Sequence, residues 1–439
     1  MGKLRYLIIC SCLFFGGFIN KIYSQDSTWL RQQIAILTAD DMFGRSGAHN
    51  GEQKAAQFLQ KHFQNIGAQP LAENGFQRFS TMGHKMEGVV RIQTNKKILN
   101  SFDEFRIAPF ATTTHVSNMS MVKVDASILL DSIQMNAFLL KNKETLYHKA
   151  IIIDATHWKN AKKFSAERIK KALHNITIKN PFPAKVILIC MDELPVWSLV
   201  NTDFQRDFAI IYIKKTALKG AKTITIDFDN TFFLKKSQNV CYAFQGTTYP
   251  DQFIILTAHY DHIGCMGDSV IFHGAHDNAS GVAAVMDFAR YFASHPPAFT
   301  TVFVLFTGEE SGLKGSEYFI NHPLVPLDDV KLMVNLDMFC GGDEGIMVVN
   351  AEAENTKPIV DKMIRINEKA HYVSTVKRRP NAANSDHYYF SKYCPAIFIY
   401  TIGGKHGGYH NYTDTCDECG LICYSNMFNL LRALITSLS

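Results

Sequence analysis

Apolar residues change their spacing along this chain, and each spacing predicts a different kind of structure. From Gln53 to Gly67 they recur every three to four positions, which predicts an amphipathic helix. The same spacing predicts a second helix from Ser280 to Ala293, and Pro296 follows it, where a helix cannot continue. Between these two helices, from about residue 100 to 235, short apolar runs alternate with polar, Lys-rich connections such as Lys159 to Lys171.

The apolar runs of the middle segment predict short strands. They are Ala150 to Ile153, Lys185 to Cys190, Phe208 to Ile213 and Thr223 to Phe228. Short strands with few helices between them indicate a β-rich module.

After about residue 238 the pattern becomes strand followed by helix, repeated. The expected strands are Phe253 to Ala258, Thr301 to Phe306, Lys331 to Leu336 and Pro395 to Tyr400. Continuous apolar strands that alternate with helices are typical of a buried, mainly parallel sheet, so this part is expected to have an α/β fold.

The first 24 residues have the layout of a secretory signal peptide. A basic start, Met1 to Arg5, precedes an apolar stretch from Leu7 to Ile19 and a polar region that ends at Ser24. About 13 apolar residues fall short of the roughly 20 that span a bilayer, so we expect cleavage near Ser24 and a secreted or periplasmic protein without a stable membrane span. Retention by a membrane anchor, or a lipid on Cys12, stays open as an alternative.

Charge excludes one class of partner. The chain has 45 Lys and Arg residues against 40 Asp and Glu residues, and removal of residues 1–24 leaves 42 against 40. Because the mature chain is close to neutral and has no long basic run, nucleic acid is not an expected partner.

Removing residues 1–24 also leaves eight of the ten cysteines. An even number in an exported protein permits disulfides, and their pairing is left open. Cys416, Cys419 and Cys423 contain a single CxxC pair, so a local disulfide or buried thiols are favoured there over a structural metal site.

Acidic and histidine residues follow each of the four predicted strands in the last part of the chain. They are His259-Tyr260-Asp261-His262, Glu309-Glu310, Asp337 and the segment from Gly403 to His410, and Asp277 precedes the second helix. The carboxyl ends of parallel strands meet in one crevice, where carboxylates this close would repel one another unless cations bound there. Histidines and carboxylates without a thiolate suit Zn²⁺, and less selectively Mn²⁺ or Co²⁺. An Asp can bridge two ions roughly 3.5–4 Å apart.

Six ordered motifs resemble those of the di-zinc aminopeptidases. They are TAHYDHIG at 257–264, GAHDNASG at 274–281, FTGEESGLKGS at 306–316, VNLDM at 334–338, SDH at 385–387 and YHNYTDT at 409–415. This family includes secreted bacterial leucyl aminopeptidases and has glutamate carboxypeptidases and glutaminyl cyclases as relatives. The resemblance covers about residues 240–416, and Leu37 to Gly67 is similar to the family's N-terminal stretch. It implies a three-layer α/β fold of the zinc exopeptidase type with a mixed, mainly parallel twisted sheet.

The resemblance also implies two zinc ions and their ligands. His259, Asp277 and Asp337 would hold one ion, and Asp277, Glu310 and His410 the other, so that Asp277 bridges them. His387 is a rival for the last ligand, but the family pattern favours His410.

Two further residues receive catalytic roles from the resemblance. Asp261 would orient His259 through its second ring nitrogen. Glu309 would be the general base that takes a proton from a metal-bridging water and passes it to the leaving amine. His387 and Tyr409 are expected in the substrate pocket.

Other histidines and two departures from the family pattern complete the candidate site. His262, His273, His276 and His406 are not expected to bind metal. His276 stands where the family usually has an acid, and Tyr389 where it has a proline; both changes could reshape the pocket.

The sequence therefore predicts an exported zinc-dependent exopeptidase, an aminopeptidase that acts on peptides with a free N-terminus. The expected division is a signal at 1–24, catalytic sequence at 25–100, a β-rich, protease-associated-like insert at 101–235, and the catalytic core at 236–439. Alternatives are a glutaminyl cyclase, a carboxypeptidase that uses Lys377-Arg378-Arg379 as a cationic pocket, and a binding module without activity.

Overall fold

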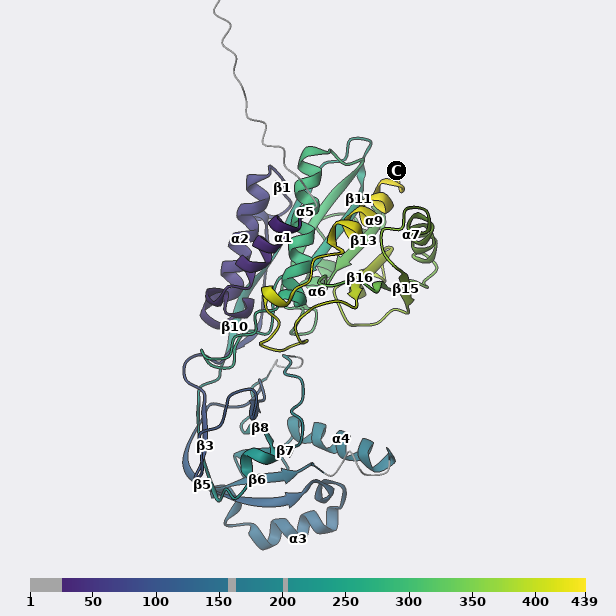
Figure 1. Cartoon of the computed structure of the whole chain (residues 1–439). Helices are drawn as coiled ribbons and strands as arrows, with labels where there is room; N and C mark the ends of the chain where they lie inside the picture. The colour runs from purple at the N-terminus through teal and green to yellow at the C-terminus, as the bar shows by residue number, and fades with distance from the viewer. Residues whose placement is uncertain (1–25, 157–162, 200–203) are drawn as a thin grey trace, which may run out of the picture.

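The computed structural model describes residues 26–156, 163–199 and 204–439, which form two bodies joined end to end (Figure 1). The larger body contains both ends of the described chain, and the smaller one is inserted between its strands β2 and β10. The expected signal peptide and Cys12 lie outside the described residues. Within the described part, no helix is long and apolar enough to cross a membrane.

Nine strands of the described chain form one mixed sheet in the larger body. Their order is β1-β10-β12-β11-β13-β16-β14-β15, and β2 pairs with β10. The strands are β1 (Gln69–Pro70), β2 (Phe76–Lys85), β10 (Thr231–Phe244), β11 (Tyr249–His259), β12 (Phe299–Phe306), β13 (Val330–Leu336), β14 (Gly345–Val349), β15 (Val376–Arg379) and β16 (Ala396–Ile402). The central strands β12, β11, β13 and β16 are parallel neighbours, whereas β10 and β14 join them in antiparallel pairs. The predicted mixed sheet is confirmed, with the parallel pairing concentrated in its centre.

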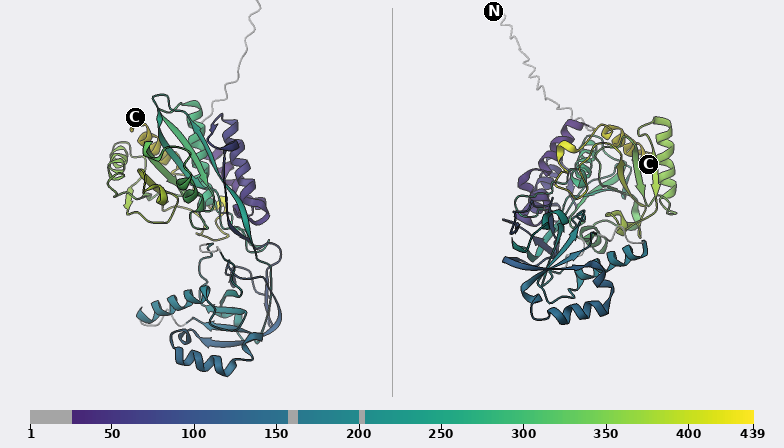
Figure 2. Two further views of the ribbon diagram at one scale, coloured as in Figure 1. Left: turned by 180° about the vertical axis from the view of Figure 1, so that it is seen from behind. Right: turned by 60° about the horizontal axis from the view of Figure 1, so that its bottom comes forward.

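Helices cover both faces of this sheet, which gives three layers (Figure 2). They are α1 (Ser27–Leu37), α2 (Gly51–Asn65), α5 (Ser280–Ser294), α6 (Lys314–Asn321), α7 (Lys357–Ala370), α8 (His387–Phe390) and α9 (Tyr424–Thr436). Ile254 and Leu256 of β11 pack in one core with side chains of α1, α2, α5, α7 and α9, whereas Ile255 packs in another with side chains of α6 and α8. Successive side chains of a strand point to opposite faces, so a continuous apolar strand serves both cores.

The smaller body has its own mixed sheet. In the described part it has seven strands in the order β3-β9-β5-β6-β7-β8-β4, of which β5 to β8 are parallel. The strands are β3 (Arg91–Thr94), β4 (Phe105–Ile107), β5 (Thr114–Asp125), β6 (Lys149–Asp154), β7 (Val186–Met191), β8 (Ala209–Lys214) and β9 (Thr223–Phe228). We call this body, residues 91–228, the insert.

Helices contribute more to the insert than the sequence predicted. Besides α3 (Ser132–Asn142), helix α4 (Lys163–Ile178) occupies most of the segment 159–171, which was expected to be a polar connection. That expectation was wrong because Ile169, Leu173 and Ile176 are spaced to pack along one side of a helix, against the insert's second core, while lysines occupy other positions.

The insert and the larger body share one hydrophobic core. Phe102, Phe105 and Trp197 of the insert pack with Ile263, Met266, Phe272 and other residues of the segment that follows β11. The insert is therefore packed directly against the chain that leads away from the carboxyl end of β11.

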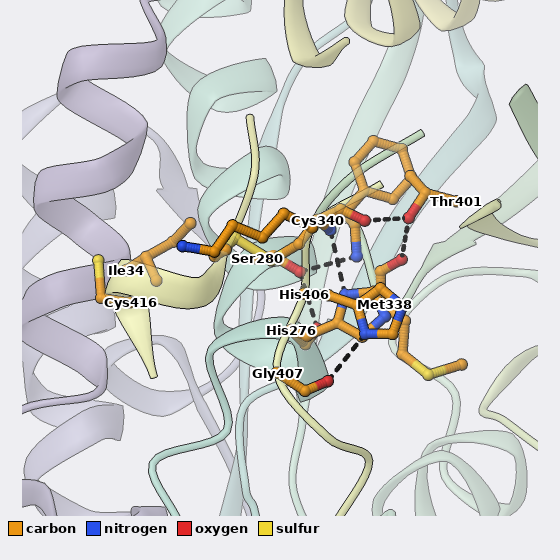
Figure 3. Close-up of a disulfide and its surroundings, with 12 residues drawn as sticks. Ile34, His276, Ser280, Met338, Cys340, Thr401, His406, Gly407 and Cys416 are labelled. Atoms are coloured by element: carbon orange, nitrogen blue, oxygen red, sulfur yellow. Dashed lines mark hydrogen bonds between the residues drawn. A yellow bond between two sulfur atoms is a disulfide. The ribbon is translucent and has the colours of Figure 1, made fainter. Parts of the chain in front are cut away.

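A disulfide joins Cys340, just after β13, to Cys419, just before α9 (Figure 3). The alternative of a local disulfide within residues 416–423 is therefore wrong, and Cys416 and Cys423 are free thiols. The pairing could not be predicted from the sequence because the two cysteines are 79 residues apart. The backbone N–H of Cys340 also donates to His276 Nδ1 at 3.2 Å, which connects the bridge to the residue before Asp277.

Candidate metal centre

The four parallel central strands deliver the predicted ligands to one edge of the sheet. His259 is the last residue of β11, and Asp337 follows β13 directly. Glu310 stands four residues after β12, and His410 lies in the loop after β16. Because β12, β11, β13 and β16 are adjacent and parallel, their carboxyl ends bring these residues together.

Asp277 lies between the two histidines. Its Oδ1 is 3.3 Å from Nε2 of His259, and its Oδ2 is 3.3 Å from Nε2 of His410. Asp337 Oδ1 lies 3.4 Å from the same nitrogen of His259, and Glu310 Oε2 lies 3.1 Å from that of His410. The structure thus brings the five residues into two sets that share Asp277.

The chemistry of these residues fits bound metal. In the described chain, Asp337 Oδ1 and His410 Nε2 are buried without a hydrogen-bond partner, although both point at other ligand atoms. Buried polar atoms normally have partners, so such atoms indicate a missing one. Imidazole nitrogens and carboxylate oxygens are the donors that zinc accepts.

Asp414, to which the sequence analysis gave no role, fixes the backbone around Asp277. Its two carboxylate oxygens accept the backbone N–H groups of His276 at 2.9 Å and Asp277 at 3.1 Å. On the other side, Asn278 Nδ2 donates to the carbonyl of Leu336 at 3.0 Å, and the Asp277–Asn278 peptide bond is cis. Asp414 belongs to the YHNYTDT motif, which was the only signal for it.

Ser385 orients Asp337. Its hydroxyl donates to Asp337 Oδ2 at 2.8 Å and accepts from Asn335 Nδ2 at 2.7 Å. Because Oδ2 is engaged in this way, Oδ1 is the oxygen that faces His259. Ser385 belongs to the SDH motif, in which only the histidine was expected to have a role.

Asp261 lies where expected but makes different contacts. Nδ1 of His259 donates to the backbone carbonyl of Asp261 at 3.1 Å, and the nearest carboxylate oxygen of Asp261 is 3.7 Å away. That carboxylate instead accepts the backbone N–H groups of Glu309 at 3.3 Å and Glu310 at 3.4 Å. The side chain of Asp261 therefore holds the two glutamates in place, while its carbonyl orients His259.

His262 lies closer to the site than predicted. Its Nδ1 is 2.8 Å from Glu310 Oε1, and its Nε2 is buried without a hydrogen-bond partner in the described chain. Donation from Nδ1 to Oε1 leaves Oε2 of Glu310 to face His410. His276 stacks on His406 with ring centroids 4.5 Å apart, and His273 donates to the carbonyl of Thr38, so these three rings are engaged elsewhere.

The charges of the site favour bound cations. Burial alone would lower the pKa of His410, but Glu310 and Asp277 outweigh it and raise the pKa to about 11. For His259, likewise, Asp337 and Glu309 overcome burial and raise the pKa well above its ordinary value. Burial raises the pKa of Glu309 well above its usual range, and Glu310, Asp386 and Asp337 add to this effect. The carboxylates therefore favour positive charge at both histidines.

Arg45 is a fixed positive charge beside the site that the sequence analysis missed. It is fully buried, and its guanidinium donates to the carbonyls of Tyr260 at 2.8 Å, Leu37 at 2.9 Å, His273 at 2.6 Å and Gly274 at 2.8 Å. Burial lowers its pKa to about 10, against the opposing effect of nearby carboxylates led by Asp277. Arg45 thus links the end of α1 to the residues just after His259 and to those just before Asp277.

The two expected pocket residues differ in exposure. His387 is fully buried, and its Nε2 is 3.1 Å from Asn381 Oδ1, so it offers no exposed surface to a substrate in this structure. Burial lowers its pKa to about 3. Tyr409 is 55% exposed, and its ring stacks on His410 with centroids 3.9 Å apart. Tyr409 is the accessible residue of the two.

Known proteins share this sequence pattern. Residues 239–435, which contain all five predicted ligands, match the model of Peptidase family M28, and the match confirms the resemblance drawn from the motifs. A probable zinc metalloprotease of Pyricularia oryzae is 41% identical over 88 residues, which cover 20% of this chain and 18% of that protein. One from Pyrenophora teres f. teres is 34% identical over 117 residues, or 26% and 24% of the two chains. The matched stretch thus spans about a fifth of these relatives.

Solved structures share the fold. An aminopeptidase from Aneurinibacillus sp. strain AM-1 superposes with a TM-score of 0.62 at 18% identity, over 93% of both chains. A zinc aminopeptidase from Bacillus subtilis gives a TM-score of 0.66 at 16% identity, over 94% of this chain and 95% of that one. These likenesses confirm the zinc exopeptidase type of fold.

Replacing Arg45 should destabilise the protein strongly. Arg45→Met leaves four carbonyls without their donor and removes a charge that faces carboxylates, so the free energy of unfolding should fall by about 3 kcal/mol or more. Arg45→Lys keeps the charge but not the planar guanidinium, and should lose less. Urea unfolding of the metal-free protein measures both, and an unchanged midpoint for Arg45→Met would contradict this role.

Proposed function

We propose that this protein is an exported zinc-dependent exopeptidase, specifically an aminopeptidase that removes N-terminal residues from peptides with a free amine. The observation that carries the proposal is the pair of buried ligand sets that share Asp277. Relatives named as probable zinc metalloproteases support the metal and the class of reaction. The choice of aminopeptidase follows the motif resemblance.

Two zinc ions per chain are part of this proposal. His259 and Asp337 would complete one coordination set with Asp277, and Glu310 and His410 the other. The separate carboxylate oxygens of Asp277 face the two histidines, which is the arrangement a bridging ligand requires. Bound zinc would polarise the scissile carbonyl and lower the pKa of water at the site.

Glu309 is the proposed general base. One of its carboxylate oxygens lies within 4.8 Å of ligand atoms of His259 and Asp337, yet Glu309 is not one of the five residues that make up the two proposed ligand sets. A carboxylate beside the ligands that does not itself hold metal is placed to take a proton from the attacking water and return it to the leaving amine. The backbone N–H of Glu309 donates to Asp261 Oδ1, which helps fix its place beside the ligands.

The described contacts weaken one alternative. A carboxypeptidase needs a positive group for the substrate carboxylate, and the sequence offered Lys377-Arg378-Arg379. This run forms part of β15 at the edge of the sheet, where Arg378 pairs with Asp361 and Glu352. The positive charge of Arg378 is therefore already balanced by these two carboxylates. A binding module without activity would not need the complete ligand set and Glu309. A glutaminyl cyclase is distinguished from an aminopeptidase by the substrates that the protein converts.

Export is supported by the disulfide. Cys340 and Cys419 are bonded in the structure, and such bonds persist in oxidising compartments. Together with the N-terminal layout, this favours a secreted or periplasmic protein.

Metal content should separate the two histidines that compete for the last ligand position. We expect His410→Ala to lower the zinc content from two ions per chain to about one, whereas His387→Ala keeps both because its ring is buried against Asn381. Elemental analysis of dialysed protein measures this. Two ions in His410→Ala together with a loss in His387→Ala would assign the ligand to His387.

Removing the general base should leave the metal in place. Glu309→Gln is expected to retain both ions and lose roughly 100-fold or more in kcat, since general acid–base catalysis contributes about that much. Glu354→Gln, at an exposed position in the chain after β14, is the matched control and should behave as the unaltered protein. Normal hydrolysis by Glu309→Gln would show that another group is the base.

Substrate choice tests the function itself. Peptides with a free amine, with a blocked amine and with N-terminal glutamine are offered with and without a chelator. We expect chelator-sensitive cleavage of the free-amine peptides. Cleavage restricted to blocked peptides would exclude the aminopeptidase, and ring closure of glutamine without cleavage would identify a cyclase.

A further inference from the structure

The insert reaches the metal centre through a backbone carbonyl. His410 Nδ1 lies 2.9 Å from the carbonyl oxygen of Trp197, a residue of the insert that precedes His410 by 213 positions. From this contact we infer that Trp197 is a positioning residue, through which the insert holds the imidazole of His410 in the orientation that one of the two metal ions needs. The inference rests on the proposed ligation by His410.

The contact decides which nitrogen of His410 faces the ligands. Nδ1 donates its hydrogen to the Trp197 carbonyl, so the neutral ring presents the lone pair of Nε2 on the other side. Nε2 is the atom that lies 3.1 Å from Glu310 and 3.3 Å from Asp277. The carbonyl therefore selects both the tautomer and the direction of the ring.

Trp197 can serve this purpose because its own position is fixed on two sides. Its indole Nε1 donates to the carbonyl of Ile107 at 2.6 Å within the insert. Its ring stacks on Phe272 of the larger body, with centroids 4.8 Å apart and planes 11° apart. The side chain is 2% exposed, so it has little room to adopt another orientation.

Further contacts fix the chain just before Trp197. The guanidinium of Arg106 donates to the carbonyl of Pro195 and lies 3.8 Å from the ring centroid of Phe102. Phe102 in turn packs edge-on against Phe272 and against Tyr412, two residues beyond His410. The insert thus contacts the His410 loop both at the ligand and beside it.

The other histidine of the centre has a different arrangement. His259 donates its Nδ1 hydrogen to the carbonyl of Asp261, only two residues away along the chain. A disturbance of the insert should therefore affect the His410 set much more than the His259 set. This asymmetry separates a positioning role from a general loss of stability.

Zinc titration of the metal-free protein tests the inference. Trp197→Ala keeps the backbone carbonyl but removes the side-chain contacts that fix its position. It should weaken one of the two binding steps by about 10-fold to 100-fold, the usual cost of disturbing a group that orients a ligand, and leave the other step nearly unchanged. Trp197→Phe keeps an aromatic ring against Phe272 but loses the bond to Ile107, so the loss should be smaller. The titration is followed by competition with a chromophoric chelator and needs no substrate.

Phe182→Ala is the matched control. Phe182 is a buried aromatic residue of the insert that packs in its second core, away from the one that contains Trp197. It should lower the stability of the insert and leave both zinc affinities unchanged. The positioning role would be overturned if Trp197→Ala weakened both steps equally, or if Phe182→Ala gave the same pattern as Trp197→Ala. Wild-type affinities in Trp197→Ala would also overturn it. If Trp197→Ala does not fold, wild-type affinities in Trp197→Phe would have the same meaning.

His410→Ala in the same titration keeps the two proposals apart. If it leaves both steps intact, the assignment of His410 as a ligand fails, and the role of Trp197 fails with it. If His410→Ala abolishes one step and the Trp197 variants change neither, only the positioning role is wrong.

Discussion

Buried negative charge is crowded at one edge of the large sheet, and many contacts of this protein serve to hold it there. Asp261, Asp277, Glu310 and Asp337 are each at most 5% exposed, and they lie around the ends of four neighbouring strands. Carboxylates removed from water at such short range are costly unless positive charge is close. Arg45 supplies part of that charge from one side, and the imidazoles of His259 and His410 face the carboxylates on the other. Bound cations would complete the balance.

Each part of the fold contributes to holding that arrangement. The parallel centre of the sheet sets the distances between strand ends, and hydrogen bonds with Asp414, Ser385 and Asp261 fix individual proposed ligands. The disulfide contacts the same region, since the Cys340 backbone bonds to His276 beside Asp277 (Figure 3). The insert meets the site through a shared core and through the carbonyl that His410 contacts. The insert therefore packs directly against the residues that form the site.

The sequence predicted those parts of the site that depend on local pattern. Apolar strands followed at once by His259, by Glu309 and Glu310, and by Asp337 place these residues at one sheet edge, because neighbouring parallel strands leave no other choice. The two helices that end before Gly67 and Pro296 could also be predicted, because their apolar residues recur every three to four positions. Arg45, Trp197 and the Cys340–Cys419 bond could not be predicted, since each depends on contacts between segments far apart in the chain and carries no local signal. The lysines of α4 made the segment look polar, although Ile169, Leu173 and Ile176 pack in the second core of the insert.

In the proposed site, Asp277 joins two metal ions, each with its own histidine. A crystal structure of the zinc-loaded protein, with anomalous data collected on both sides of the zinc absorption edge, tests it most directly. We predict two anomalous peaks roughly 3.5–4 Å apart, the usual spacing in two-metal sites, one beside His259 and Asp337 and the other beside Glu310 and His410. A single peak, or a second peak held by residues outside this set, would contradict the account.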